Sequence, residues 1–223
     1  MINYSENNII TLVGTIVSER VFSHEVYGEG FYSFNIEVPR LSDNSDIIPV
    51  TVSERILTDD FKIGQKVIID GQFRSYNNYE NEKNKLVLTV FAKDIKMQDD
   101  ESEVTNPNEI CLTGFICKKP IYRTTPFGRE ISDIMLAVNR RYGKSSYIPC
   151  IIWGRNARFM TNFDVGTEIE IFGRFQSREY LKKYLDHEER VNDYKKAMKY
   201  VDKSDLERFI GYLIACLQEE LIN

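Results

Sequence analysis

Residues 8–40 read NIITLVGTIVSERVFSHEVYGEGFYSFNIEVPR, and residues 108–140 read NEICLTGFICKKPIYRTTPFGREISDIMLAVNR. These stretches align at an offset of 100 residues, and IGQKVIIDGQFRS (63–75) aligns with VGTEIEIFGRFQS (165–177) after a two-residue insertion. Identical pairs at the first offset are Asn8/Asn108, Leu12/Leu112, Gly14/Gly114, Gly28/Gly128, Val38/Val138, Arg40/Arg140, Pro49/Pro149 and Arg55/Arg155. The chain is therefore a tandem repeat of one structural unit.

Both copies alternate apolar and polar residues with the period of two that is typical of β-strands. Each copy runs through a first strand, a turn, a second and a third strand, a loop or short helix, and a fourth strand; copy one adds a fifth strand at 85–97. Glycines interrupt these strands where a tightly coiled barrel leaves no room for a side chain, at Gly14, Gly71, Gly114 and Gly173. This order predicts a mainly β protein with two tandem five-stranded OB-fold barrels, the second without a recognisable last strand.

The domain boundaries follow from the repeat. We expect a first OB-fold domain at 1–100, an acidic polar linker at 101–107, a second OB-fold domain at 108–180 and a C-terminal α-helical segment at 181–223. The helical prediction rests on a capping box from Ser204 to Glu207 and on an apolar stripe at helical spacing, Leu206, Phe209, Ile210, Leu213, Ile214, Leu217 and Leu221. The segment either covers an open barrel edge or forms a dimer or partner interface.

The overall composition excludes several classes of protein. No run approaches 18 uncharged apolar residues and no basic segment precedes an apolar one at the N-terminus, so we expect a cytoplasmic protein without a membrane span. The four cysteines, Cys111, Cys117, Cys150 and Cys216, include no C-x-x-C pair, and the two histidines lie far from them in sequence. We therefore expect reduced thiols, no metal site and no cofactor.

The net charge of −5 argues against a nucleic-acid partner until it is divided by segment. Residues 1–100 carry 10 basic and 16 acidic residues, a balance of −6, whereas residues 107–180 carry 11 basic and 7 acidic residues, a balance of +4. The second copy therefore has the charge of a nucleic-acid-binding domain.

The third strand of copy two, YIPCIIW at 147–153, places Tyr147 and Trp153 on the face opposite to Ile148, Cys150 and Ile152. Two further aromatic residues, Tyr142 and Tyr180, lie before this strand and after the fourth. Seven cations interleave with the four rings: Arg140, Arg141, Lys144, Arg155, Arg158, Arg174 and Arg178. Rings that stack on bases, beside cations that contact phosphates, are typical of single-strand binding, although each ring taken singly is equally consistent with packing at a barrel rim.

Copy one lacks this face, because Ser42, Ile47 and Ser53 occupy the positions of Tyr142, Tyr147 and Trp153. We expect copy two to be the principal binding domain and copy one to act as a scaffold, a dimerisation domain or a protein contact. The alternative is that copy one binds through other residues, for which Phe73, Tyr76 and Tyr79 are available.

Copy two resembles the bacterial single-stranded DNA-binding protein family over about 75 residues, and copy one resembles it more weakly. The resemblance rests on the opening L-x-G strand, the turn PFG, LAVNR, the aromatic residue before WG, and GRFQSREY. It implies that Tyr142, Tyr147, Trp153 and Tyr180 stack on the bases of single-stranded DNA during replication, recombination or repair. It also implies four OB domains, which a two-barrel chain reaches as a homodimer.

Family members usually end in an acidic tail tipped by Pro-Phe, which recruits replication and repair proteins. This sequence ends in EELIN, so recruitment through such a tip is not expected.

Two other functions compete with DNA binding. One is a protein-interaction module without nucleic-acid binding, and the other is a nuclease or nuclease accessory domain. The sequence contains no P-loop, no H-E-x-x-H and no nucleophile elbow, and HEER at 187–190 lacks the second histidine of a zinc motif. We therefore expect a protein that is not an enzyme.

Overall fold

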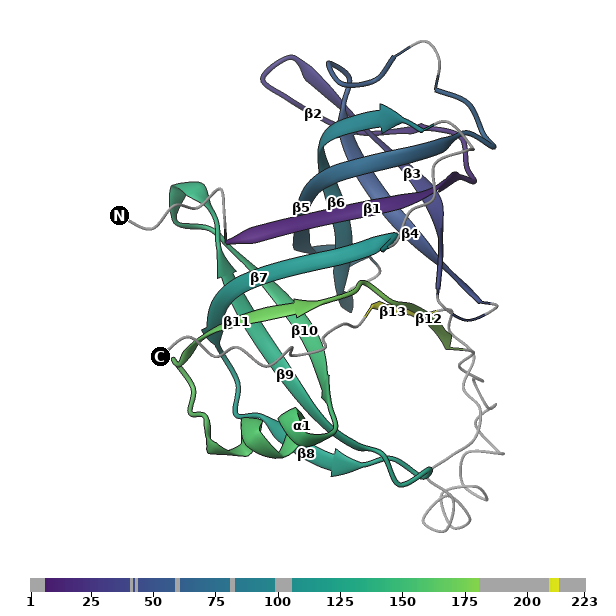
Figure 1. Ribbon diagram of the computed structural model, residues 1–223. Coiled ribbons are helices and arrows are strands. Elements are labelled where there is room, and N and C mark those ends of the chain that lie inside the picture. Colours follow the sequence, from purple (N-terminus) through teal and green to yellow (C-terminus); the bar gives the residue numbers. More distant parts are fainter. Residues whose placement is uncertain are drawn as a thin grey trace, which may run out of the picture. The chain divides into compact units, whose positions relative to one another are not determined.

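The computed structural model describes residues 7–40, 42, 44–58, 61–80, 83–98, 106–180 and 209–212. The chain divides into two compact units, of which the first comprises residues 1–176 and 213–223 and the second residues 177–212. Both repeats lie in the first unit, so contacts between them can be described (Figure 1).

Barrel one consists of β1 (Asn8–Ile16), β2 (Val21–Val26), β3 (Glu29–Pro39), β4 (Ser45–Ser53), β5 (Lys66–Glu80) and β6 (Lys83–Met97). Strand pairing closes it in the order β1–β3–β4–β6–β5–β1, in which only the β4–β6 pair is parallel. β2 is an additional arm that pairs with β3 across the two-residue turn Tyr27-Gly28, whose backbone φ angles of 51° and 78° lie in the left-handed region. The predicted five-stranded OB-fold barrel is confirmed.

Barrel two consists of β7 (Asn108–Ile116), β8 (Ile121–Thr124), β9 (Glu130–Asn139), β10 (Ser145–Trp153), the short helix α1 (Arg155–Phe159) and β11 (Glu168–Gly173). One-turn 3-10 helices lie at η1 (Arg141–Gly143) and η2 (Met160–Asn162). β9 pairs with β7, β8 and β10, and β7 pairs with β11. Within the described residues no strand joins β10 to β11.

The structure reproduces the repeat at the level of single hydrogen bonds. The amide of Asn8 donates to the carbonyl of Phe73 at 2.6 Å and accepts from its N–H at 2.7 Å, and Asn108 makes the same two bonds with Phe175 at the same distances. Each asparagine therefore ties the first strand of its barrel to the fourth-strand segment, within β5 at Phe73 and just after β11 at Phe175. Phe73 and Phe175 also contact each other edge to face, with ring centroids 4.5 Å apart.

The barrels join through their first strands, which run side by side in Figure 1. β1 and β7 pair antiparallel with Ile10 opposite Ile110, Asn8 opposite Leu112 and Leu12 opposite Asn108. Equivalent residues therefore exchange places about the central pair, as in a symmetric homodimer interface. A single chain thus contains two OB folds related by an approximate twofold axis.

The alternating pattern sends one face of each strand into a buried core. Fully buried members include Ile10, Leu12, Ile36, Ile48, Ile69, Leu136, Ile148 and Ile152. Each such side chain contributes about 1.5–3 kcal/mol through burial. A Cβ atom on Gly14 or Gly114 would lie 2.5 Å from the Glu37 carbonyl oxygen or 2.6 Å from that of Ala137, so neighbouring strands approach too closely there for a side chain.

The helical prediction for residues 181–223 lies mostly outside the described residues. The exception is Phe209–Tyr212, which forms β13 and pairs antiparallel with β12 (Ser177–Tyr180), so the prediction was wrong at these four positions. The segment FIGY suits a strand as well as a helix, because it combines aromatic and β-branched residues with a glycine that disfavours helices, and pairing with β12 decides between them.

The described part of the chain contains no helix with both the length and the hydrophobicity that crossing a membrane requires.

Candidate nucleic-acid interface

β10 presents two aromatic side chains on its outer face. Ile148, Cys150 and Ile152 point into the core, where burial raises the pKa of the Cys150 thiol to about 12. Tyr147 is 51% exposed and Trp153 is partly exposed on the opposite side, as the alternation predicts. The six-residue spacing on one strand puts these rings about 20 Å apart.

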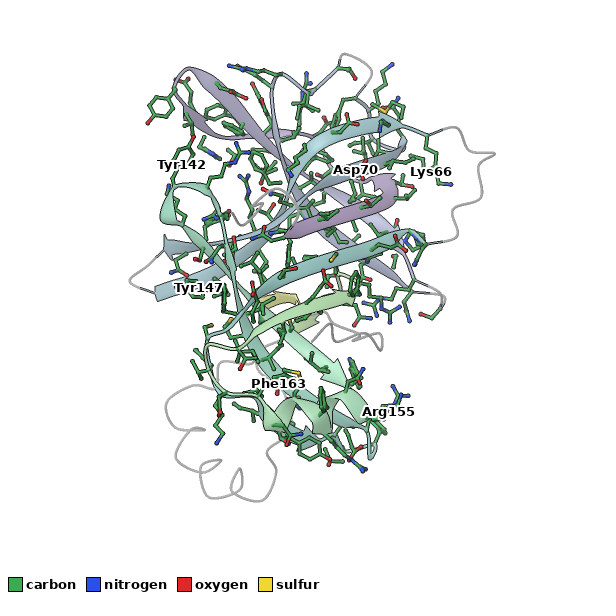
Figure 2. All side chains as sticks on the ribbon, turned by 60° about the vertical axis from the view of Figure 1, so that its left-hand side comes forward. Lys66, Asp70, Tyr142, Tyr147, Arg155 and Phe163 are labelled. Atoms are coloured by element: carbon green, nitrogen blue, oxygen red, sulfur yellow. The ribbon has the colours of Figure 1, made fainter. Side chains whose placement is uncertain are left out.

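The loop before β10 carries a third ring and three cations. The N–H of Arg140 donates to the carbonyl of Lys144 at 2.7 Å, which closes the loop and forces Tyr142 into a left-handed conformation with a φ of 62°. Tyr142 is 94% exposed, so its ring is free on both faces. Figure 2 shows Tyr142 and Tyr147 on the same side of the view.

A cleft of about 590 Å³ opens where this loop faces barrel one. We call it the interbarrel cleft; its lining residues are His24, Val26, Phe31, Gln72, Arg74, Phe91, Lys93, Arg140, Arg141, Tyr142 and Lys144. Five of them are Lys or Arg and none is Asp or Glu. The cleft is therefore an anion-attracting surface to which both barrels contribute.

Arg74 lines the cleft close enough to Arg140 and Lys93 for their positive charges to interact. Its guanidinium carbon lies 3.5 Å from the centroid of the Phe91 ring, and its Nη2 donates to Oε1 of Gln72 at 3.0 Å. Its buried Nε finds no acceptor among the described residues. Burial, and secondly the charge of Arg140, lower the pKa of Arg74 to about 10, and burial followed by the charges of Arg74 and Arg141 lowers the pKa of Lys93.

The other predicted phosphate contacts are dispersed. Arg155 and Arg158 follow the opposite end of β10, and Figure 2 shows Arg155 well away from Tyr142. Arg158 forms an ion pair with Glu130, Nε to Oε1 at 2.5 Å, which holds the pKa of that carboxyl below its usual range. The side chains of Arg178 and Tyr180 are outside the described residues. The seven cations therefore do not gather on one face.

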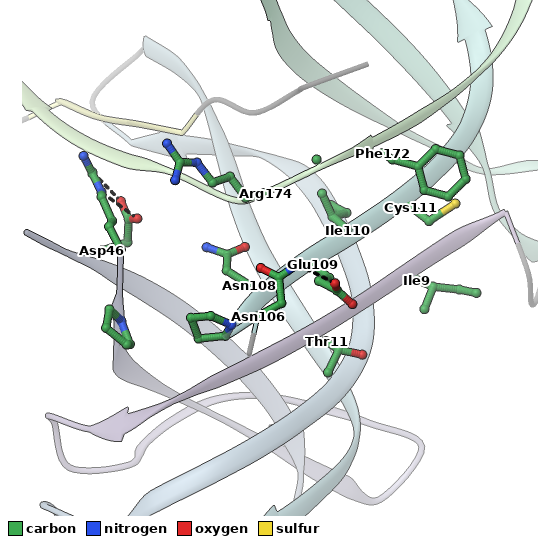
Figure 3. A pocket seen from close by; sticks show the side chains of 14 residues that line it. Ile9, Thr11, Asp46, Asn106, Asn108, Glu109, Ile110, Cys111, Phe172 and Arg174 are labelled. Carbon is green, nitrogen blue, oxygen red and sulfur yellow. Dashed lines mark hydrogen bonds and ion pairs between the residues drawn. The ribbon is translucent and has the colours of Figure 1, made fainter. Parts of the chain in front are cut away.

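Arg174 lines a second hollow, the β1–β7 pocket, of about 650 Å³ (Figure 3). Its walls come from Ile9, Thr11, Pro39, Arg40, Asp46, Asn106, Pro107, Asn108, Glu109, Ile110, Cys111, Phe172, Gly173 and Arg174. Two cations there face two carboxylates, and Arg40 is paired with Asp46 at 2.6 Å. The charged residues that line this pocket therefore sum to zero, in contrast to those of the interbarrel cleft.

Sequence reasoning missed the barrel-one side of the interbarrel cleft. Arg74 and Lys93 stand on β5 and β6, inside a copy whose total charge is −6. Of the residues considered for binding by copy one, Phe73 is only 1% exposed and belongs to the core, whereas Tyr76 is exposed. The alternation of residues along β5 could have predicted this side of the cleft. Gln72 and Arg74 alternate with the buried Phe73, so their side chains point out of the barrel.

The described residues hold no cluster of three or more His, Cys, Asp or Glu side chains that could bind a metal ion. The three described cysteines are free thiols, and the pKa of Cys111 is raised to about 11, mainly by burial and then by Glu170.

The second repeat matches the model of a known protein family. The model of the Single-strand binding protein family matches residues 107–195. Single-stranded DNA-binding protein B of Bacillus subtilis (strain 168) is 31% identical over 94 residues, which cover 39% of this chain and 79% of that protein. The chain belongs to the single-strand binding protein family.

Other members of the family match less of their length. Single-stranded DNA-binding protein 1 of Staphylococcus aureus (strain COL) is 35% identical over 80 residues, which cover 33% of this chain and 48% of that protein. The chain thus spans about half the length of this relative. The crystal structure of wild-type single-stranded DNA binding protein from Thermus aquaticus matches with a TM-score of 0.65 at 19% identity, over 77% of this chain and 85% of that chain, which is a likeness of fold.

Proposed function

We propose that the protein binds single-stranded DNA and that barrel two is the principal binding domain. The observation that carries this proposal is the row of exposed rings, Tyr142, Tyr147 and Trp153, along β10 and the loop before it. Stacking on such rings is worth about 1–3 kcal/mol per base and tolerates any base sequence. The cations of the same loop supply the phosphate contacts that single-strand binding also requires.

The proposed roles follow the predicted residues. Bases stack on Tyr142, Tyr147, Trp153 and Tyr180, and phosphates contact Arg140, Arg141, Lys144, Arg155, Arg158, Arg174 and Arg178. The names of the family relatives support DNA rather than RNA as the ligand. The protein would hold and protect exposed strands during replication, recombination or repair in the cytoplasm, by binding and without catalysis.

Titration with oligo-dT tests the proposal, with Trp153 as the reporter because it is the single tryptophan of the chain. We expect its fluorescence to be quenched at low salt and the affinity to fall as salt rises, because binding releases counterions from the strand. Absence of quenching and of a mobility shift at low salt would refute DNA binding and favour the protein-interaction module. Shortened oligonucleotides after incubation with Mg²⁺ would instead reveal a nuclease.

We also propose that the chain forms a homodimer with four OB domains. Ile9, Cys111 and Phe172 are direct cross-strand neighbours on β1, β7 and β11, and Figure 3 shows the side chains of Cys111 and Phe172 next to each other. Ile9 is 45% and Phe172 40% exposed, which leaves an apolar row uncovered across the strands that join the barrels. A symmetric partner would cover this row with its own copy.

Solution mass tests the homodimer. We expect twice the chain mass for the wild type and a shift toward monomer for Phe172→Glu, while Ile63→Glu, at an exposed apolar residue of a barrel-one loop, leaves the mass unchanged. A monomeric wild type at micromolar concentration would contradict the proposal.

A further inference from the structure

We propose that barrel one completes the DNA site of barrel two: Arg74 and Lys93 bind phosphates of the same strand in the interbarrel cleft. This inference rests on the proposed function and extends it to the acidic copy, which lacks the stacking residues of copy two. The anion recognised is the phosphodiester backbone of a single strand that leaves Tyr142 and crosses onto β5 and β6.

The first argument is uncompensated charge. The cleft brings five cations together without a carboxylate in its lining, and the lowered pKa values of Arg74 and Lys93 record burial and the repulsion between them and the arginines of barrel two. A folded protein that holds like charges together gains stability when an anion binds among them. A phosphate would be such an anion.

The second argument is the orientation of Arg74. Stacking on Phe91 fixes the plane of the Arg74 guanidinium. Of the nitrogens of this group, only Nη2 donates a hydrogen bond to Gln72. The guanidinium therefore keeps further N–H donors in a fixed plane, and such donors are the groups with which arginine binds phosphate oxygens.

The third argument is an aromatic wall next to these cations. The rings of His24 and Phe31 stack in parallel with centroids 4.9 Å apart, and the Phe31 and Phe91 centroids lie 5.8 Å apart. Arg74 covers Phe91 at the end of this row. The sugars and bases of a bound single strand would therefore pack against this aromatic row while its phosphates contact the cations next to it, as at other single-strand binding sites.

The fourth argument is the asymmetry between the two hollows. The β1–β7 pocket contains Arg40 and Arg174 but also Asp46 and Glu109. Of these two pockets, only the interbarrel cleft would therefore present net positive charge to a DNA strand that crosses between the barrels. This predicts one preferred crossing point in a molecule with twofold-related barrels.

Two matched lysines of β6 allow a direct test. Both lysines are exposed, but Lys93 lines the cleft, whereas Lys96 stands outside its lining on the same strand and pairs with Asp94 at 3.0 Å. With oligo-dT, we expect Lys93→Gln to lower the affinity about fivefold at 0.1 M salt and to reduce the slope of log K against log salt by about 0.7, the value for one lost phosphate contact on a single strand. Lys96→Gln should change neither quantity appreciably.

A second variant, Arg74→Lys, keeps the charge but removes the planar group, and should also lower the affinity while the melting temperature shows that the fold is kept. The cleft proposal is overturned if Lys93→Gln and Arg74→Lys bind with the wild-type affinity and salt slope while wild-type quenching persists. If the wild-type protein itself does not bind oligo-dT, the proposed function is refuted as well. Binding by the wild-type protein therefore separates a failure of the cleft proposal from a failure of the proposed function.

Discussion

Arg40 and Arg140 occupy the same position in the two barrels, but among the described residues only Arg40 has a carboxylate partner. Each arginine donates its N–H across an equivalent loop, to Asn44 at 3.0 Å or to Lys144 at 2.7 Å. Asp46, which is buried opposite Val38, accepts from Nε and Nη2 of Arg40 at 2.8 and 2.6 Å. The residue opposite Val138 is Ser146, and Nε of Arg140 finds no acceptor among the described residues.

The difference shows how one fold holds an arginine in an ion pair in one copy and leaves the equivalent arginine without a carboxylate partner among the described residues in the other. In barrel one the arginine is part of the structure, since its hydrogen bonds to Asp46 raise its pKa. In barrel two the equivalent Arg140 has an Nε without an acceptor among the described residues, and Arg141 and Lys144 stand where copy one has Leu41 and Asn44. This difference predicts distinct effects for substitutions at equivalent positions of the two barrels.

Asp46→Ala should have the largest effect, and on stability. It leaves the guanidinium of Arg40, whose side chain is 24% exposed, without its buried partner, which costs about 3 kcal/mol. Urea denaturation should show the loss, whereas Ser146→Ala, at the equivalent position, removes one 3.3 Å hydrogen bond from the N–H of Ser75 but leaves no charge without its partner, and should cost about 1 kcal/mol. Equal losses for both variants would contradict the structural role of the Arg40–Asp46 pair.

Tyr147→Ala tests the stacking face against its counterpart in barrel one. We expect a loss of about 2 kcal/mol of binding free energy for oligo-dT, because one base loses its stacking partner. The matched control is Ile47→Ala, which removes an exposed apolar side chain from the same position of barrel one and should leave the affinity unchanged. Similar losses would mean that barrel one binds DNA through this face too.

Ser146→Asp introduces into barrel two a carboxylate at the position of Asp46, so that Arg140 gains the ion-pair partner that Arg40 has in barrel one. The new carboxylate would lie opposite Val138 beside Arg140 and neutralise it, so we expect the affinity for oligo-dT to fall by about tenfold, as for one lost charged contact. The salt dependence of binding should weaken at the same time. An unchanged affinity, with the fold intact by circular dichroism, would show that Arg140 does not contact the strand.

The sequence predicts those parts of this comparison that depend on local pattern. The alternation along β10 places Tyr147 and Trp153 outside the barrel, and the repeat offset pairs Arg40 with Arg140 and Asp46 with Ser146. The interbarrel cleft depends instead on the antiparallel register of β1 and β7, a contact between segments 100 residues apart that no periodicity encodes. Arg74 and Lys93 were not predicted as binding residues for a second reason. The acidic residues of copy one outnumber its basic residues, so its net charge gives no sign of a local positive surface.

Arg158→Gln should have the smallest effect and compares two cations of barrel two with each other. Glu130 already compensates the charge of Arg158, whereas Arg141 lies in a cleft without acidic lining residues. Neutralising a paired cation removes less favourable potential from the DNA path, so we expect about a twofold loss of affinity for Arg158→Gln and about fivefold for Arg141→Gln. Measured at several salt concentrations, the reverse order would move the main phosphate path from the loop before β10 to the helix that follows it.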